Sequence, residues 1–294
     1  MASRSESREP GPDVPGDSAG VYFLSVEAFE ARTEPPRYES RPPQESPVTE
    51  RKIHFDETVA AGYDATSAHM FDTALLDATT AFLAEHAQGG AALEFAVGTG
   101  RVALPLVARG VPVTGIEISQ PMLDRLAAKP GADAIAVTCG DIARTRVEGT
   151  FSLVYLVFNT ITNLTSQDEQ VACFQNAADH LDPGGRFVIE CYVPQLRSVP
   201  YGERFRPYDV SDTHVGFDEF SDFVAQIQYS HHVYTEKDGT MRRFSAPFRY
   251  VWPSELDLMA RLAGMRLVER WADWGRARFT GESRSHVSVW EKVR

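Results

Sequence analysis

Short apolar segments of strand length alternate with helical segments between residues 91 and 192. The strand candidates cover residues 91–96, 111–116, 134–137, 151–158 and 186–192, and the helical candidates lie near 101–109, 119–129 and 166–181. Such alternation requires crossover connections between parallel strands. The sequence therefore predicts an α/β fold, a Rossmann-like doubly wound sheet with five parallel strands.

The alternation stops after residue 192. Residues 223–235 and 241–251 are strand-like and are separated by Asp238-Gly239, a typical hairpin turn. We expect an inserted antiparallel β lid over residues 194–251 that covers a substrate.

The core of the predicted fold then comprises residues 52–193 and 252–294. It should contain one or two helices over 65–88 and a helix over 254–263, while Ser166 and Glu169 form a capping box that begins another helix. Two strand candidates, 265–274 and 286–293, should close the sheet as a terminal antiparallel pair.

Residues 1–51 are interpreted as an N-terminal tail and arm, partly disordered. The first 20 are polar and rich in proline and glycine, whereas residues 21–29 are apolar enough to dock onto the body. Neither a signal-peptide core nor an apolar run of membrane-spanning length is present. We therefore expect a cytoplasmic protein that does not bind membranes.

Composition narrows the function classes further. The chain has 41 acidic and 29 basic residues, a net charge of −12, and no basic stripe, which disfavours a nucleic-acid partner. Its three cysteines show neither metal-ligand spacing nor a disulfide framework, so no metal is expected. The expected partner is a small-molecule substrate, and a homodimer is left open.

A glycine-rich loop follows the first predicted strand. Gly98 and Gly100 lie between a strand that contains Glu94 and a helical segment, so the backbone can approach a ligand closely there. The pattern also fits dinucleotide-binding proteins, which leaves an NAD-dependent oxidoreductase as an alternative. Glu117, at the end of the second strand, can accept hydrogen bonds from two ribose hydroxyls.

Two later features favour another cofactor. Asp141 follows the third strand, where it is placed to meet an adenine amine, and the turn Pro183-Gly184-Gly185 leads into the fifth strand. Dinucleotide enzymes do not usually combine these features.

In the order of these motifs, the chain resembles the class I S-adenosylmethionine-dependent methyltransferases over about residues 60–294. The resemblance implies S-adenosyl-L-methionine as the cofactor and methyl transfer as the reaction. It places around the methionine part, the ribose and the adenine the residues Tyr63, Glu94, Ala96, Val97, Gly98, Gly100, Glu117, Ile118, Met122, Asp141, Ile142, Phe158 and Asn159.

This chain departs from the family at two positions of the loop. The family usually has glycine at the position of Ala96, and alanine is expected to be tolerated there if its φ is negative. Val97 replaces a residue that is commonly small or cysteine.

Methyl transfer is an in-line displacement that proximity alone can accelerate, and a base is needed only for an acceptor that must lose a proton early. The candidate catalytic residues are His231, His232, Asp64 and Tyr22. The two adjacent histidines should point to opposite faces of a strand. Structural roles remain open for each of them, and Asp64 can instead be the N-cap of a helix that begins at Ala65.

The aromatic residues of the predicted lid favour an apolar or aromatic acceptor, with an indole-like ring preferred, and do not distinguish N, O and C acceptors. Similar hairpin insertions occur in small-molecule methyltransferases of bacterial secondary metabolism and antibiotic biosynthesis. Sugar N-methyltransferases are one alternative. A non-catalytic S-adenosylmethionine-binding sensor is another.

Overall fold

The computed structural model describes residues 55–293, apart from the side chain of His69. The expectations for residues 1–51, including Tyr22 as a catalytic residue, fall outside this range. The helices are α1 (Glu57–Thr66), α2 (Thr73–Ala87), α3 (Ala103–Ala108), α4 (Gln120–Ala127), α5 (Gln167–His180) and α6 (Pro253–Leu262), with short 3₁₀ turns η2 (Ala68–Phe71), η3 (Ala132–Ala134), η4 (Thr160–Asn163) and η5 (Leu196–Ser198).

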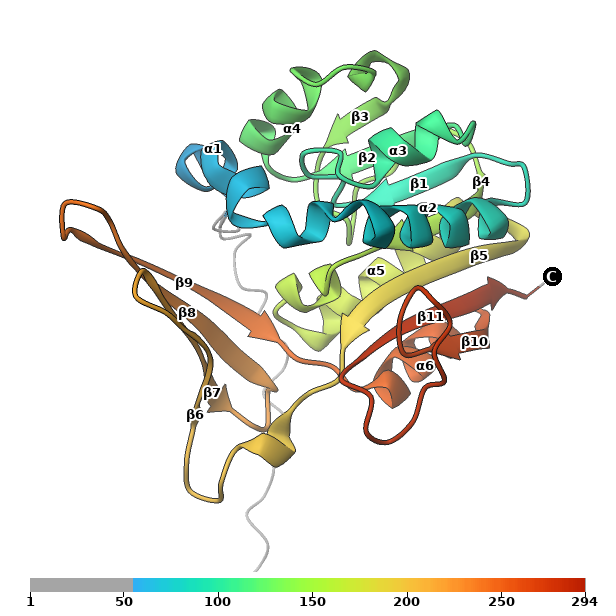
Figure 1. The fold of residues 1–294 in the computed structure, drawn as a ribbon. Coiled ribbons are helices and arrows are strands. Elements are labelled where there is room, and N and C mark those ends of the chain that lie inside the picture. The colour runs from blue at the N-terminus through green and yellow to red at the C-terminus, as the bar shows by residue number, and fades with distance from the viewer. Residues whose placement is uncertain (1–54, 294) are drawn as a thin grey trace, which may run out of the picture. The chain divides into compact units, whose positions relative to one another are not determined.

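Seven strands form the main sheet, in the order β10-β11-β5-β4-β1-β2-β3 (Figure 1). They are β1 (Ala92–Phe95), β2 (Val113–Glu117), β3 (Ala136–Cys139), β4 (Phe151–Leu156), β5 (Leu181–Tyr192), β10 (Met265–Trp271) and β11 (Ser285–Lys292). Strands β1 to β5 are parallel, and β11 pairs antiparallel with both β5 and β10. The predicted sheet of five parallel strands with a terminal antiparallel pair is confirmed.

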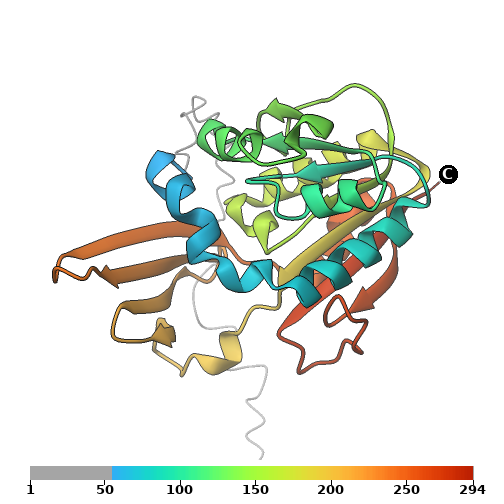
Figure 2. The same ribbon diagram turned by 45° about the horizontal axis from the view of Figure 1, so that its top comes forward.

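Hydrophobic residues cover both faces of this sheet, as expected for strands buried on two sides. Alternate strand residues divide between two cores: Leu93 and Phe95 face α5 and α6, whereas Ala92 packs with α2, α3 and α4. Helix α2 lies across β4 and β5 on the face of the sheet to which Ala92 points (Figure 1, Figure 2). With both faces covered, polar side chains gather at the ends of the strands.

Helix starts follow their capping residues. The predicted capping box of α5 is present. Ser166 Oγ accepts a hydrogen bond from the Glu169 amide at 3.2 Å, and the Glu169 carboxylate accepts one from the Ser166 amide at 3.1 Å. The prediction that Asp64 caps a helix at Ala65 is wrong. Asp56 caps α1, its carboxylate accepting from the Val59 amide at 3.0 Å, so Asp64 lies in the last turn of that helix.

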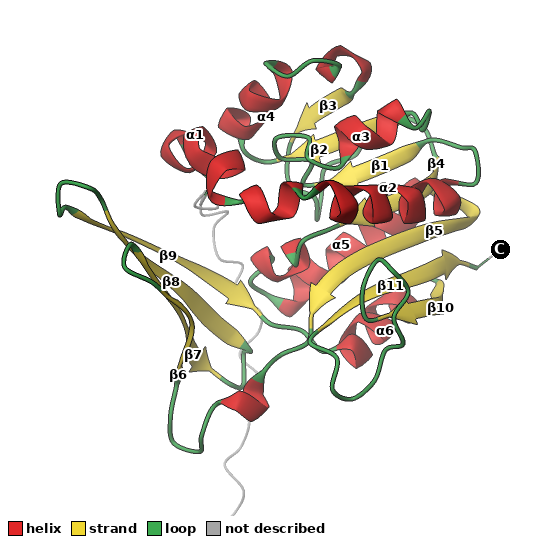
Figure 3. Ribbon diagram, in the orientation of Figure 1, coloured by secondary structure: helices red, strands yellow, loops and turns green. Residues whose placement is uncertain are grey.

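A separate four-stranded antiparallel sheet lies between β5 and α6 in sequence (Figure 3). Its strands, in spatial order, are β6 (Phe205–Val210), β7 (His214–Asp222), β8 (Ile227–Thr235) and β9 (Met241–Arg249). The sequence predicted β8 and β9 but missed β6 and β7. The buried Arg249 links this sheet to α5 and α6, with bonds of 2.5 Å to Gln170 and 3.0 Å to Glu255.

None of the helices within residues 55–293 is long and apolar enough to cross a membrane.

Candidate functional site

The loop between β1 and α3 has three residues with left-handed backbone. They are Ala96 (φ 57°), Gly98 (φ 55°) and Gly100 (φ 80°). A Cβ on Gly100 would lie 2.4 Å from Cδ1 of Leu126, whose side chain would have to shift, so both the space and the left-handed backbone favour glycine. The condition set for alanine at position 96, a negative φ, is not met, and this alanine bears the steric strain that glycine avoids.

Glu117 connects this loop to the end of β2. Its Oε2 accepts a hydrogen bond from the Gly98 amide at 3.0 Å, and its Oε1 accepts from the Ser119 amide at 2.9 Å. Burial raises the pKa of Glu117, and the two amides partly oppose that shift. Each carboxylate oxygen keeps a lone pair, so the group can also accept from two neighbouring hydroxyls of a ligand.

Glu94, near the end of β1, is almost completely buried. Tyr155 of β4 donates a hydrogen bond of 2.8 Å to its Oε2. Burial raises the pKa of Glu94 to about 8, although the Tyr155 hydroxyl, the Arg101 charge and the Ala103 amide favour the carboxylate. The carboxyl is therefore poised to lose its proton when a cation approaches.

Arg101 is a site residue that the sequence analysis missed. Its Nη1 donates to the Met70 carbonyl at 3.2 Å, and its guanidinium lies over the ring of Phe158, 5.8 Å from the centroid. The same charge favours ionisation of Tyr63 and Tyr192, whose pKa values burial raises. A signal was present, since an arginine directly follows the glycine loop at the start of an apolar helix.

Asp64 ties α1 to the glycine loop. Its Oδ1 accepts from the Thr99 hydroxyl at 2.6 Å, and its Oδ2 lies 2.5 Å from Nζ of Lys129, which also donates to the Thr99 carbonyl at 2.8 Å. The neighbouring Tyr63 stands edge-on to Phe55, with ring centroids 6.0 Å apart. These bonds hold α1 against the site.

The side predicted for adenine is formed by the ends of β2 and β3. Asp141 accepts from the Ala143 amide at 2.9 Å, which closes a tight turn, and Ile142 is buried. Met122 is buried near the loop, its methyl group 3.9 Å from where a Cβ on Gly98 would be. Ile118, half-buried, precedes α4.

Val97 differs from its neighbours in the loop. Its side chain is buried in the core with α2, α3 and α4 and fills the space above Gly115, where a Cβ would come within 2.7 Å of it. Only the backbone of Val97 is therefore available to contact a ligand at the loop.

The end of β4 forms another wall of the site. Phe158 and Asn159 are half-buried and are both left-handed, with φ of 56° and 57°. The Asn159 side chain is held by β5, since its Oδ1 accepts from the Tyr192 amide at 3.0 Å. Its Nδ2 donates to Thr162 at 3.0 Å.

Known proteins are similar to this chain in sequence and in fold. Residues 92–185 match the family described as methyltransferase domain. The CcbJ methyltransferase from Streptomyces caelestis is 40% identical, with a TM-score of 0.68 over 74% of this chain and 89% of that chain. The chain belongs to the methyltransferase family.

Two further proteins are similar to this chain, one in sequence and one in fold. A cypemycin N-terminal methyltransferase from Streptomyces sp is 27% identical over 251 residues, which cover 81% of this chain and 97% of the relative. An S-adenosylmethionine-dependent methyltransferase from Clostridium acetobutylicum ATCC 824, 16% identical, shares the fold with a TM-score of 0.65 over 81% of this chain and 98% of that chain. This methyltransferase depends on S-adenosylmethionine, so the oxidoreductase and sensor alternatives are set aside.

The histidines of β8 lie on opposite faces of the four-stranded sheet, as predicted. His231 contacts Ser245 Oγ at 2.8 Å and Glu219 Oε2 at 3.1 Å. His232 contacts His214 at 3.0 Å and the Tyr208 hydroxyl at 3.1 Å. Both rings are thus held by partners in their own sheet.

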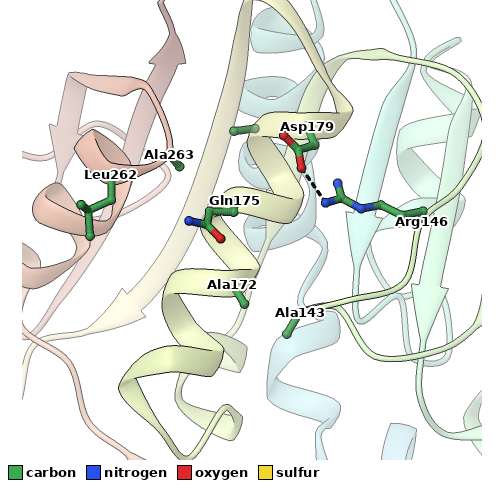
Figure 4. Close-up of a pocket in the computed structure, with 8 residues that line it drawn as sticks. Ala143, Arg146, Ala172, Gln175, Asp179, Leu262 and Ala263 are labelled. Atoms are coloured by element: carbon green, nitrogen blue, oxygen red, sulfur yellow. Dashed lines mark hydrogen bonds and ion pairs between the residues drawn. The ribbon is translucent and has the colours of Figure 1, made fainter.

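Among residues 55–293, no group of three or more His, Cys, Asp or Glu side chains is arranged to hold a metal ion. A surface hollow of about 340 Å³ lies between α5, the end of α6 and the segment after β3 (Figure 4). The Arg146–Asp179 ion pair borders it. None of the residues predicted to bind the cofactor lines this hollow.

Proposed function

We propose that this methyltransferase transfers the methyl group of S-adenosylmethionine to a nitrogen atom of a small, largely apolar metabolite. The observation that carries the donor site is the Glu117 carboxylate, which the Gly98 and Ser119 amides fix at the end of β2. When bound there, S-adenosylmethionine would supply the methyl group of its sulfonium, because attack of the acceptor nitrogen on the methyl carbon breaks the carbon–sulfur bond and releases S-adenosylhomocysteine.

The roles of the site residues follow from their chemistry. Glu117 accepts hydrogen bonds from the ribose hydroxyls, and Asp141 meets the adenine amine. The Glu94 carboxyl receives the methionine ammonium, and Arg101 receives the methionine carboxylate. Opposite charges at one end of the donor fix its orientation, which places the methyl group for attack.

Nitrogen is the acceptor that best fits the residues described. A neutral amine attacks through its lone pair and loses its proton afterwards, so no base must act before transfer. The relative from Streptomyces named for N-terminal methylation supports an amine. Half-buried aromatic side chains on the His232 face of the four-stranded sheet, Tyr234 and Phe244, support an apolar acceptor body and a role of this sheet as a substrate lid.

A proton leaves the product nitrogen, and His232 is our candidate to take it. Burial lowers the pKa of His232, and the charge of His214 lowers it further, so the ring is neutral and can accept a proton. His214 lies 3.0 Å from His232 and 2.5 Å from Asp209, which links the ring to a carboxylate.

The sugar N-methyltransferase alternative has one observation in its favour. The face of the sheet with His232 also presents hydroxyls, since Tyr208 and Ser230 bond to each other at 2.9 Å. Polar groups of this kind suit the hydroxyls of a sugar ring.

The test is a mass-spectrometric assay of purified enzyme with S-adenosylmethionine and two substrate panels. One panel holds aromatic amines such as tryptamine, and the other holds amino sugars. Methylation of the aromatic amines, seen as a gain of one methyl group on nitrogen, supports the proposal. Methylation of amino sugars alone, or of oxygen or carbon atoms, contradicts it.

A further inference from the structure

The wall of the site formed by Phe158 and Asn159 has an improbable backbone. Two successive residues other than glycine are both left-handed, with φ of 56° and 57°. Such conformations are disfavoured by the Cβ atom and persist only where the surroundings impose them. The groups that impose this turn are therefore of functional interest.

Glu190 of β5 holds the turn at two points and is itself held by a third bond. Its Oε2 accepts from the Phe158 amide at 2.8 Å, and its backbone carbonyl accepts from the Asn159 amide at 3.1 Å. Its Oε1 accepts from the indole N–H of Trp274 at 2.9 Å. Trp274 is buried and packs edge-on against Phe82 of α2, with ring centroids 5.4 Å apart. The carboxylate is thus anchored from the core behind it.

Phe158, which Glu190 holds, faces Arg101. The guanidinium of Arg101 lies over the Phe158 ring, and its charge acts on Glu94 and Tyr63 at the end of the site assigned to methionine. We propose that Glu190 is a positioning residue, which fixes Phe158 and through it Arg101 for the amino-acid end of the donor. The inference rests on the donor placement proposed above.

A carboxylate is the group that this position requires. Two N–H donors, from Phe158 and Trp274, converge on its two oxygens. Glutamine has the same shape, but its NH₂ group would face one of those donors, so it can satisfy only one. The conservative change Glu190→Gln is therefore predicted to release the turn.

The test compares two ligands by calorimetry. S-adenosylhomocysteine carries the amino-acid end, whereas 5′-methylthioadenosine lacks it and uses only the adenosine side. We expect Glu190→Gln to weaken S-adenosylhomocysteine about tenfold, the loss of one bond to a charged group, and to leave 5′-methylthioadenosine within about twofold. Equal weakening of both ligands, or none, would overturn the inference.

Glu269→Gln is a matched control, because Glu269 also accepts an indole N–H, from Trp271 at 2.8 Å, on β10. It should change neither affinity; a selective loss of S-adenosylhomocysteine binding in this control would contradict the role given to Glu190. If the wild-type enzyme bound neither ligand, the donor placement itself would fail, which separates the two proposals.

A double variant gives an independent readout. Trp274→Phe removes one donor, so in Glu190→Gln/Trp274→Phe the glutamine can turn its oxygen to the Phe158 amide without facing a second N–H. We expect the double variant to bind S-adenosylhomocysteine more tightly than Glu190→Gln alone. A merely structural role makes the two changes add, and weaker binding by the double variant would refute the positioning role.

Discussion

The hydroxyl of Tyr155 donates a hydrogen bond of 2.8 Å to the carboxyl group of Glu94, and both side chains are buried. The bond joins neighbouring strands β4 and β1 at the start of the glycine loop. The bond gives the buried carboxyl a hydrogen-bond partner, yet the pKa of Glu94 is about 8 because burial outweighs the groups that favour the carboxylate. The acid is therefore held in place but not ionised at neutral pH.

This shift predicts how stability depends on pH. The pKa of Glu94 rises from 4.5 to about 8 on folding, so between these values only the folded state keeps the proton. Without cofactor, the contribution of Glu94 to the free energy of unfolding is full below pH 4.5 and is lost as the pH rises through 8. The free energy of unfolding then falls by at most about 1.4 kcal/mol per pH unit. Urea unfolding from pH 5 to 8.5 should show this fall in the wild type and a flatter profile in Glu94→Gln. Parallel profiles would contradict it.

The left-handed Ala96 predicts a stabilising substitution. Glycine has no Cβ to clash at φ 57°, so Ala96→Gly should raise the free energy of unfolding by about 0.5–1 kcal/mol. Ala61→Gly, at an exposed position of α1, is the control and should lower it by a similar amount, about 0.5–1 kcal/mol. Destabilisation by Ala96→Gly would show that the strain is relieved in solution.

His286 predicts sensitivity to acid. Burial, with the charge of Arg270, lowers the pKa of His286 to about 3 from 6.5. The unfolded chain binds a proton below pH 6.5 that the folded chain does not, so stability falls as the pH falls from 6.5 toward 3. His286→Gln should lose less stability than the wild type between pH 7.5 and 4.5. Comparison of the two pH values within each protein removes the packing effect of the substitution.

The fold was predictable because its strands are buried on both faces and so appear as short apolar runs between helices. Strands β6 and β7 were missed because these two segments lack such a pattern. Most of β6 is exposed and it contains Pro207. In β7 only Gly216 and Phe220 are buried, and Gly216 is covered by the Tyr208 ring rather than by a side chain of its own.

The site was predictable where a motif marks it and hidden where it depends on tertiary contacts. Glu117 lies at a strand end that the sequence identifies. Glu190 and Tyr155 sit inside apolar strands, and their partners are distant in sequence. The sign of φ at Ala96 was also hidden, although the glycine usual at that position in the family was the available signal.

The role proposed for His232 is tested by kinetics. His232→Ala should lower kcat by about 10²-fold or more if the ring takes the proton, while the Kd for S-adenosylhomocysteine stays within about twofold. His231→Ala, on the opposite face, tests the other histidine of β8 in the same assay. If both variants turn over like the wild type, proximity of donor and acceptor accounts for the rate.

The central claim is that Glu117 holds the ribose of the methyl donor. Calorimetric titration with S-adenosylhomocysteine should show binding to the wild type and a loss of about 30-fold or more in Glu117→Ala, since two charge-assisted bonds disappear. Circular dichroism should confirm that the variant is folded. Undiminished affinity in a folded Glu117→Ala protein would contradict the account.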